Sequence, residues 1–429
     1  MNGGTAKITI SEKPIIRTGS IGGGGTLSSS GKIGSANINI SGGDIQAQFV
    51  MAAGAATDPE FIMTDGLIRN SQTNDSEYKH IKSEGGAVYL EAGRFEMSGG
   101  EIRNCSADLG GAIYIKGRET TQGQQNETKF ILSGNGKITE CISNTSGGAV
   151  YLENGSVYLH GGEISGNLAN NGNGGGICIV GGNLYMQDAS QVDAINNGQN
   201  RSIGSTTIKN NAAFGGSGGG VYVSSSTDDV TVNLHQGKIQ SNSATRYGGG
   251  VCVDMGEVDE DDSNTINVSQ GPKAMVEVGT GNVGPEITFN HSTLKGGGLY
   301  ASGTDANITI NAGSIKENTV SGYVDNPNVA NEGGMVTLNG DDVTTFVTVT
   351  YNNNFEYHGQ SGVSTETQRI VTNTNTKMIA PTEWFAQGYL LGYTLSGWNT
   401  RPDGKGISYS TGATMKLSSS ITLFAQWTR

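Results

Sequence analysis

Cysteine, proline and charged residues are all scarce in this chain of 429 residues. The 7 prolines and 34% hydrophobic residues, set against 69 glycines, are typical of a turn-rich chain of β-strands and not of a helical protein. Charged residues make up 15%, and 26 basic residues stand against 39 acidic ones. A net charge of −13 provides no basic surface for a phosphate backbone. Neither nucleic acid nor an anionic membrane is therefore expected as a partner.

Long hydrophobic runs are also missing. No segment approaches the roughly 20 apolar residues of a membrane-spanning helix. The opening residues, MNGGTAKITI, lack the basic and apolar regions of a signal peptide. We expect no membrane insertion in this segment, and we interpret the chain as an extracellular or cell-surface protein whose export signal and anchor lie outside it.

Two glycines followed by a short apolar strand recur along the chain. Eight copies begin at Gly85, Gly110, Gly147, Gly174, Gly218, Gly248, Gly296 and Gly333. Irregular spacings of roughly 25 to 50 residues indicate one supersecondary unit stacked many times, with variable loops inserted in some copies. We predict an all-β fold over residues 1–340, a parallel β-helix (solenoid) with three strands in each coil.

Alternation within the repeated strand assigns its side chains to two sides. In GGAVYL, Val88 and Leu90 point one way, while Ala87 and Tyr89 point the other. We expect the β-branched and leucine column to stack in the interior, where each buried residue contributes roughly 1.5 to 3 kcal/mol. The opposite column carries Tyr89, Tyr114, Tyr151, Tyr222 and Tyr300, with Cys178 and Cys252 replacing tyrosine in two copies. If these rings face solvent, we expect them to bind a ligand, because aromatic faces pack well against sugar rings and against anchor residues of a protein partner. The alternative is that the rings are buried beneath loops.

Polar residues recur at the bends between strands. An I-x-x-N pattern places asparagine at one bend, where we expect stacked amides to form a structural ladder. The ladder comprises Asn167, Asn211, Asn242, Asn290 and Asn318, with Ser71, Cys105 and Cys141 at equivalent places. His160 and His235 share another bend position, and we interpret them as turn residues rather than metal ligands, because other coils separate them.

The four cysteines are spaced by 36, 37 and 74 residues, which fits no zinc pattern. Adjacent coils would bring Cys105 and Cys141 within disulfide range, although neighbouring parallel strands seldom orient the sulfur atoms well. Cys178 and Cys252 have the coil of Tyr222 between them and cannot bond. Free buried thiols are the favoured interpretation.

An acidic run between two strands is a candidate calcium site. It contains Asp254, Glu257, Asp259 and Asp261, whose carboxylate oxygens are ligands that calcium prefers. The run lacks the pattern of an EF-hand and of the calcium-binding nonapeptide, so a solvated charged loop is the alternative. No other cofactor is expected.

The motifs GGA[ILV] and [FI]-x-x-N recur together between about residues 60 and 340. They resemble the repeats of polymorphic outer-membrane adhesins and related β-helical surface proteins. This resemblance implies a right-handed β-helix displayed outside the cell. The long insertions depart from the family's pattern, and no export route is implied.

Residues 341–429 lack the glycine pairs and form a second predicted domain. Their motifs are GYT from Gly392, GW from Gly397, DGKG from Asp403 and TLFAQW from Thr422. In this combination they resemble the Listeria-Bacteroides repeat, or internalin B-repeat, of bacterial surface proteins. The resemblance implies a small β-grasp-like fold found as a spacer or interaction module.

The physical properties of this segment also favour a separate small domain. Trp398, Phe424 and Trp427 are expected to supply its core, because each brings a large apolar area. The Asp403-Gly404 turn is expected to join a hairpin.

We expect a non-enzymatic adhesin that binds a host or microbial surface glycan or protein through loops 117–128, 188–206 and 254–264. A polysaccharide lyase or glycoside hydrolase on the same fold is the alternative, and a purely structural stalk is a third hypothesis. Candidate catalytic residues would be Asp228, Asp229, Asp341, Asp342, Arg201 and Arg246. None of these falls in the repeated strands that would align carboxylates on one face, which argues against hydrolysis.

Overall fold

The structure, a computed structural model, describes residues 6–11, 15–23, 36–51, 58–71, 82–117, 127–187, 205–225, 227–256, 273–321, 327–332, 335–338, 346–354, 365–371, 376–377, 394–415, 417 and 421–428. Across these residues every regular element is a β-strand, which confirms the all-β prediction. The chain divides into two compact units, Met1–Gly322 with Asn328–Val343 and Tyr323–Pro327 with Thr344–Arg429. No helix that could cross a membrane is found in the described part of the chain.

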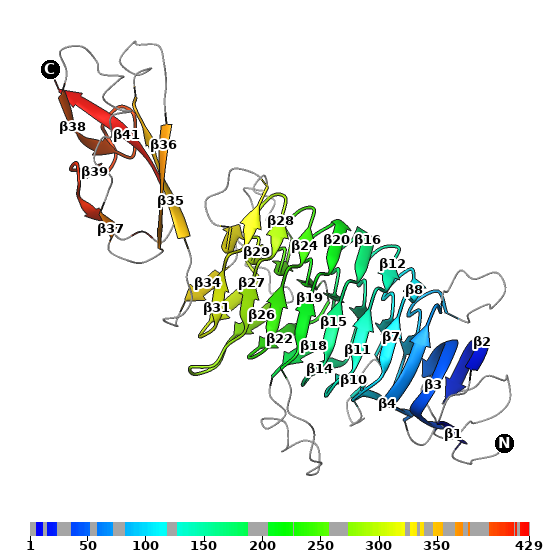
Figure 1. Cartoon of the computed structure of the whole chain (residues 1–429). Helices are drawn as coiled ribbons and strands as arrows, with labels where there is room; N and C mark the ends of the chain where they lie inside the picture. The colour runs from blue at the N-terminus through cyan, green and yellow to red at the C-terminus, as the bar shows by residue number, and fades with distance from the viewer. Residues whose placement is uncertain are drawn as a thin grey trace. The chain divides into compact units, whose positions relative to one another are not determined.

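Four rows of short strands run along the larger unit, and Figure 1 shows the strands of each row stacked side by side. The first row contains β5 (Val88–Leu90), β9 (Ile113–Ile115), β13 (Val150–Leu152), β17 (Ile177–Ile179), β21 (Val221–Val223), β25 (Val251–Asp254), β29 (Leu299–Ser302) and β33 (Val329–Glu332). The second row contains β6 (Arg94–Met97), β10 (Lys129–Leu132), β14 (Ser156–Leu159), β18 (Asn183–Met186), β22 (Val230–Leu234), β26 (Ala274–Val278), β30 (Ala306–Ile310) and β34 (Met335–Leu338). The third row contains β7 (Glu101–Arg103), β11 (Lys137–Thr139), β15 (Glu163–Ser165), β19 (Thr207–Lys209), β23 (Lys238–Gln240), β27 (Glu286–Thr288) and β31 (Ser314–Lys316).

A fourth row forms a sheet of its own. It contains β8 (Ser106–Ala107), β12 (Ile142–Ser143), β16 (Leu168–Gly172), β20 (Ala212–Gly215), β24 (Ser243–Ala244), β28 (His291–Ser292) and β32 (Thr319–Val320). These strands pair in parallel as a 7-stranded sheet, whereas the first three rows belong to one 27-stranded parallel sheet. The larger unit is therefore solenoid-like, with four strands in a coil where the sequence predicted three.

The extra strand exists because a corner divides the last part of each coil into two strands, such as β7 and β8. At Asn104 the backbone has a φ of 51°, a left-handed conformation that bends the chain between β7 and β8. Every coil with a fourth-row strand has such a residue there, including Glu140, Ser241 and Phe289. Since asparagine adopts this conformation readily but glutamate and phenylalanine do not, no single residue type marks the corner in the sequence.

The glycine pairs form the opposite corner, before each first-row strand. Gly85 has a φ of 64°, which favours glycine. A Cβ atom on the following residue, Gly86, would lie 2.3 Å from the carbonyl oxygen of Gly111 in the next coil. The repeat therefore needs two glycines for two reasons, a left-handed backbone and a close approach between coils.

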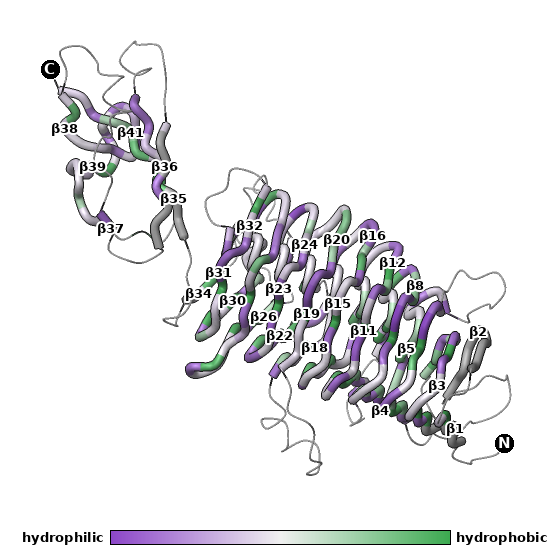
Figure 2. Tube along the Cα trace, in the orientation of Figure 1, coloured by the Kyte–Doolittle hydropathy of each residue, from purple (hydrophilic) through white to green (hydrophobic). Residues whose placement is uncertain are grey.

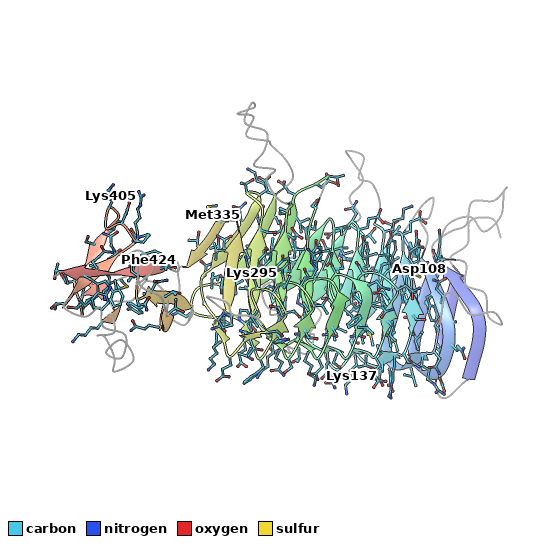
Figure 3. All side chains as sticks on the ribbon, turned by 90° about the horizontal axis from the view of Figure 1, so that it is seen from above. Asp108, Lys137, Lys295, Met335, Lys405 and Phe424 are labelled. Atoms are coloured by element: carbon cyan, nitrogen blue, oxygen red, sulfur yellow. The ribbon has the colours of Figure 1, made fainter. Side chains whose placement is uncertain are left out.

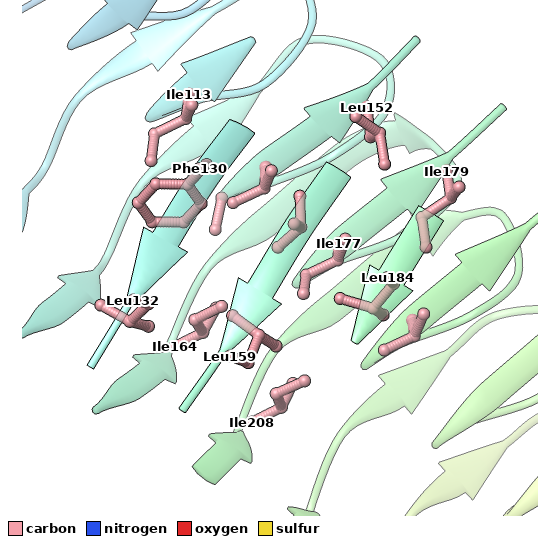
Figure 4. Packing of buried hydrophobic residues seen from close by; sticks show 14 of the residues in the cluster. Ile113, Phe130, Leu132, Leu152, Leu159, Ile164, Ile177, Ile179, Leu184 and Ile208 are labelled. Atoms are coloured by element: carbon pink, nitrogen blue, oxygen red, sulfur yellow. The ribbon is translucent and has the colours of Figure 1, made fainter. Parts of the chain in front are cut away.

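The predicted interior column is confirmed by the strand register. Val88 pairs with Ile113, which pairs with Val150, and all three side chains are fully buried. Figure 4 shows side chains from several rows meeting in the interior, among them Ile113, Phe130 and Leu152. Hydrophobic and hydrophilic residues alternate along the coils in Figure 2, as expected for strands with one buried side.

Four strands of 5 to 16 residues open the larger unit. They are β1 (Ala6–Ile10), β2 (Ile15–Gly23), β3 (Ala36–Met51) and β4 (Glu60–Arg69). β1 and β2 both pair with β3, and β4 continues into the second and third rows through β6 and β7. A stack of buried rings fills this end, with centroids of neighbouring rings 4.4 to 5.1 Å apart, in the order Phe49, Phe61, Phe95 and Phe130.

The smaller unit contains a 5-stranded sheet in the order β36-β35-β41-β38-β39 and a 2-stranded sheet of β37 and β40. The strands are β35 (Phe346–Asn352), β36 (Thr365–Val371), β37 (Thr376–Lys377), β38 (Thr394–Asn399), β39 (Ser408–Tyr409), β40 (Thr414–Met415) and β41 (Ile421–Thr428). The predicted hairpin is confirmed, because β38 and β39 pair antiparallel on either side of the Asp403-Gly404 turn. The buried Asn399 amide accepts from the N–H groups of Arg401 and Gly406, which fixes that turn.

The core of the smaller unit contains Trp398 and Trp427, as predicted. The prediction for Phe424 was wrong, since its side chain is only half-buried. Period-two alternation in β41 puts Leu423 and Ala425 on the same face as Trp427, and therefore Phe424 on the other face. Phe424 is labelled in Figure 3.

Candidate functional site

The tyrosine column follows the outward side of the first row. Register pairs Tyr89 with Tyr114 and Tyr114 with Tyr151, and then runs through Cys178, Tyr222, Cys252 and Tyr300. The predicted alignment of these residues is therefore confirmed. Facing outward does not leave them open to solvent: Tyr89 is 4% exposed, Tyr114 8% and Tyr300 3%, and Tyr151 is half-buried.

The tyrosine rings contact one another. Tyr114 stacks between Tyr89 and Tyr151, with centroid distances of 5.3 and 5.5 Å. Farther along, Tyr300 stacks on Tyr247 at 4.5 Å. The two cysteines interrupt the stack and pack against Tyr222. Much of the ring area that a ligand would use is thus occupied by neighbouring side chains, and ligand binding by this column stays a prediction.

In some coils a carboxylate stands two residues after the column residue, as with Glu91, Glu153 and Asp254. The hydroxyl of Tyr114 donates to Glu153, and the hydroxyl of Tyr222 donates to Asp254 over 3.3 Å. Burial raises the pKa of Tyr89 to about 12, and the nearby carboxylates of Glu91, Glu84 and Glu153 act in the same direction. Burial, reinforced by the hydrogen bond to Glu153, also raises the pKa of Tyr114. The tyrosines are neutral hydrogen-bond donors at physiological pH.

All four cysteines are free and buried, as the sequence favoured. Cys105 and Cys141 occupy ladder positions, where each Sγ atom lies 3.3 to 3.4 Å from a carbonyl oxygen two residues earlier, that of Arg103 or Thr139. Burial raises the pKa values of the Cys141, Cys178 and Cys252 thiols. Because the thiolate is the nucleophile and the metal ligand, these groups are unreactive.

The predicted acidic site is only partly described. Glu257, Asp259 and Asp261 lie outside the described residues. Asp254 accepts hydrogen bonds from the Ser302 and Tyr222 hydroxyls, at 2.8 and 3.3 Å. No group of three or more metal-ligating side chains occurs within the part of the chain that the structure covers.

The candidate residues for polysaccharide cleavage have separate surroundings. Asp229 accepts a hydrogen bond from the backbone N–H of Lys273, and Asp228 contacts Thr227. Arg246 lies over the ring of Tyr247, with its Cζ atom 5.5 Å from the centroid. Arg201, Asp341 and Asp342 lie outside the described residues, as do most of the predicted binding loops.

The asparagine ladder is confirmed in atomic detail. Each Nδ2 group donates to the Oδ1 atom of the asparagine in the next coil, as from Asn211 to Asn242 at 3.0 Å. The same Oδ1 atom accepts the backbone N–H of Asn211, also at 3.0 Å. A second Nδ2 bond reaches a backbone carbonyl, that of Ile164 for Asn211. The ladder ends at Asn328, which the I-x-x-N pattern missed because Asn328 lies just before β33.

The two histidines are separated by a coil, as predicted. β18, which precedes Gln187, pairs with both β14 and β22, so Gln187 lies between His160 and His235. The Nδ1 atom of His160 lies 3.0 Å from the Gln187 carbonyl oxygen. The Nε2 atom of His235 lies 3.1 Å from Glu277. These contacts join neighbouring coils, and neither imidazole belongs to a group of three or more metal-ligating side chains among the described residues.

The outward face of the third row is strongly charged, which the sequence analysis did not recognise. Its strands carry outward Glu101, Arg103, Lys137, Glu163, Lys209, Lys238, Glu286 and Lys316. Ion pairs join adjacent strands, as between Lys209 and Glu163 at 3.0 Å and between Lys238 and Glu286 at 3.1 Å. This charged face is marked by Lys137 in Figure 3.

The outward face of the 7-stranded sheet has the opposite character, and the sequence analysis missed it as well. Two columns of side chains face outward from this sheet, and we call them together the outward strip. The inner column contains Ser106, Ile142, Leu168, Ala212, Ser243, His291 and Thr319. The outer column, two residues farther along, contains Asp108, Asn144, Asn170, Phe214, Thr245, Thr293 and Ser321. Asp108 is the one member of either column that is Asp, Glu, Lys or Arg.

Exposed apolar side chains gather on this strip. Among the described residues, eight large hydrophobic side chains are exposed, and two of them, Ile142 at 39% and Phe214 at 62%, belong to the strip. Two others, Phe289 and Leu294, lie directly beside it in the coil of His291. Because alternation with a period of two does not stand out in strands of two to five residues, only the register found in three dimensions identifies this surface.

No protein-family model matches the chain, and neither a curated protein nor a solved structure shows significant similarity to it. The fold and the surfaces therefore define its class by themselves. It is an all-β protein with a solenoid-like stack of parallel strands and a smaller β-sheet unit.

Proposed function

We propose that this chain is a non-enzymatic, extracellular bacterial surface protein of adhesin-like type. In this proposal the larger unit is a right-handed parallel β-helix and the smaller one a β-grasp-like module, as the two sequence resemblances imply. The partner is a host or microbial surface glycan or protein. Nucleic acid is not expected, because the chain has a net charge of −13.

One observation supports this proposal more than any other. In the described residues, the cysteines, the column tyrosines and the ladder asparagines are committed to structural contacts: the thiols are buried, the tyrosines stack, and the asparagines bond to each other. What remains exposed is a set of long, regular outward faces. Such surfaces suit binding and display more than a reaction, which needs convergent groups in a concave site.

The test has two parts. Labelled protein is incubated with intact bacterial and mammalian cells, and binding is measured by flow cytometry. In parallel, the protein is incubated with neutral and acidic polysaccharides, with and without calcium, and the supernatant is analysed for oligosaccharides by mass spectrometry. We expect saturable cell binding and intact polymers.

Released oligosaccharides would overturn the non-enzymatic proposal in favour of a lyase or a glycoside hydrolase. Intact polymers together with no cell binding would favour the third hypothesis, a structural stalk. If binding or release requires calcium, the acidic run that begins at Asp254 becomes the region to mutate first.

A further inference from the structure

We infer that the outward strip of the 7-stranded sheet binds a neutral, linear polysaccharide that lies along the stacking direction of the coils. This inference rests on the proposed function, and it names both the site and the chemical class of its ligand.

The charge of the strip selects the class of polysaccharide. Asp108 stands at the end of the strip next to β8, where it accepts a hydrogen bond from the Asn144 amide at 2.7 Å. The remaining positions carry no lysine or arginine to pair with a uronate or sulfate group and no second carboxylate to repel one. An acidic glycan on such a surface would have charged groups that are desolvated without an ionic partner, whereas a neutral glycan has none.

The side chains of the strip match the two surfaces of a sugar ring. The 62% exposed ring of Phe214 and the neighbouring aliphatic side chains of Ala212 and Leu168 can pack against the apolar face of a pyranose. The amide of Asn170 and the hydroxyl of Thr293 are exposed, so they can bond to sugar hydroxyls. The strip therefore offers both apolar and hydrogen-bonding side chains to a sugar chain.

One part of the strip is already ordered by its own hydrogen bonds. The Nδ1 atom of His291 lies 2.9 Å from the Thr319 hydroxyl, and its Nε2 atom lies 2.9 Å from the Ser321 hydroxyl. These contacts join the inner and outer columns across two coils. Polar groups that are held in place before binding lose less conformational entropy when a ligand arrives.

The dimensions favour a linear chain over a globular partner. Seven strands about 4.8 Å apart extend over roughly 29 Å, while the two columns are only about 7 Å apart. A stable protein–protein interface is a broad patch of about 800 Å² on each partner. A linear polymer needs only a long, narrow and periodic surface, and the spacing between coils is close to the length of one pyranose residue.

The experiment is affinity electrophoresis in native gels that contain hydroxyethylcellulose, glucomannan or dextran, with polygalacturonate as the acidic counterpart. We expect at least one neutral polymer to slow the full chain and polygalacturonate not to. Phe214→Ala should weaken the retardation roughly tenfold, the loss expected for one aromatic contact of about 1.4 kcal/mol. Met275→Ala is the matched control, because Met275 is 48% exposed on the outward face of the second row.

Every result decides the inference. Retardation that Phe214→Ala leaves unchanged places the binding site elsewhere, and retardation by polygalacturonate alone excludes a neutral ligand. If no neutral polymer slows a protein that still binds cells, the ligand class is wrong while the adhesin proposal stands. If the protein binds neither polymers nor cells, both fail. An unchanged melting temperature of the Phe214→Ala variant confirms that it is folded.

Discussion

The tyrosine column and the outward strip both face away from the interior of the same coils, yet they differ in what covers them. The tyrosines stack on each other, donate to carboxylates and are mostly buried. The strip presents Phe214 and Ile142 to solvent, and Asp108 is the one Asp, Glu, Lys or Arg in its two columns. Both regions contain aromatic residues at outward positions. The comparison teaches that strand alternation fixes which way a side chain points but not whether water reaches it.

Two causes explain the difference. In the first row a large ring recurs in neighbouring coils, and rings about 4.8 Å apart fill the space between them. In the outer column of the strip, Phe214 is the one aromatic residue, and its side chain is 62% exposed. A repeated aromatic residue is therefore covered by its counterparts in neighbouring coils, whereas the faces of an isolated ring stay exposed to solvent and to a ligand.

The largest expected effect is at the centre of the tyrosine stack. Tyr114→Ala should lower the free energy of unfolding by about 3–5 kcal/mol, because a buried aromatic side chain leaves a cavity between two rings. Phe214→Ala, the matched change in the strip, should alter it by less than about 0.5 kcal/mol. Urea unfolding followed by circular dichroism measures both. Equal small losses would show that the tyrosine column is as open as the strip.

The next largest effect is a difference in stability between alanine variants of a buried and an exposed asparagine. Asn242→Ala removes amide bonds to Asn290 and Ile208 and leaves the partners of a buried group unpaired, which should cost about 3 kcal/mol. Asn170→Ala, on the exposed strip, should cost less than about 0.5 kcal/mol. Thermal unfolding of the two variants makes the comparison. A small loss for Asn242→Ala would contradict the structural role of the ladder.

A third prediction concerns alkaline pH. The pKa of Tyr89 is raised to about 12, from an unfolded value near 10, so the folded state holds its proton more tightly. The resulting stabilisation is complete below pH 10 and is lost as pH rises from about 10 to 12. Unfolding midpoints measured across this window should fall. In the Tyr89→Phe variant they should fall less steeply, and an unchanged slope would contradict the assignment.

The smallest effect is expected on the charged face. Lys238 and Glu286 are 3.1 Å apart, with side chains 45% and 53% exposed. Lys238→Ala should therefore cost only about 0.2–1 kcal/mol. The difference from the wild type should disappear at 1 M salt, where the screening length is about 3 Å. A loss that persists at high salt would mean that Lys238 acts by packing and not by charge.

Much of the fold could be read from particular residues. The columns that begin at Val88 and Leu90 were assigned to the interior because branched residues alternate with others in every copy, and the register agrees. The ladder was predicted because asparagine recurs after the same isoleucine. The fourth strand was missed, since residues as different as Asn104 and Phe289 adopt the same left-handed corner. No residue type marks that bend.

The sequence by itself determined the all-β architecture, the stacked repeat and the identity of the buried columns, because glycine corners and alternating apolar residues are local patterns. Only the tertiary structure decided which outward residues are exposed, since coils that are neighbours in space are separated by 23 to 48 residues along the chain. The tyrosines are buried because their rings cover one another, whereas Ile142 and Phe214 remain exposed to solvent. The exposure of an outward side chain depends on the side chains around it, and these come together only when the coils stack.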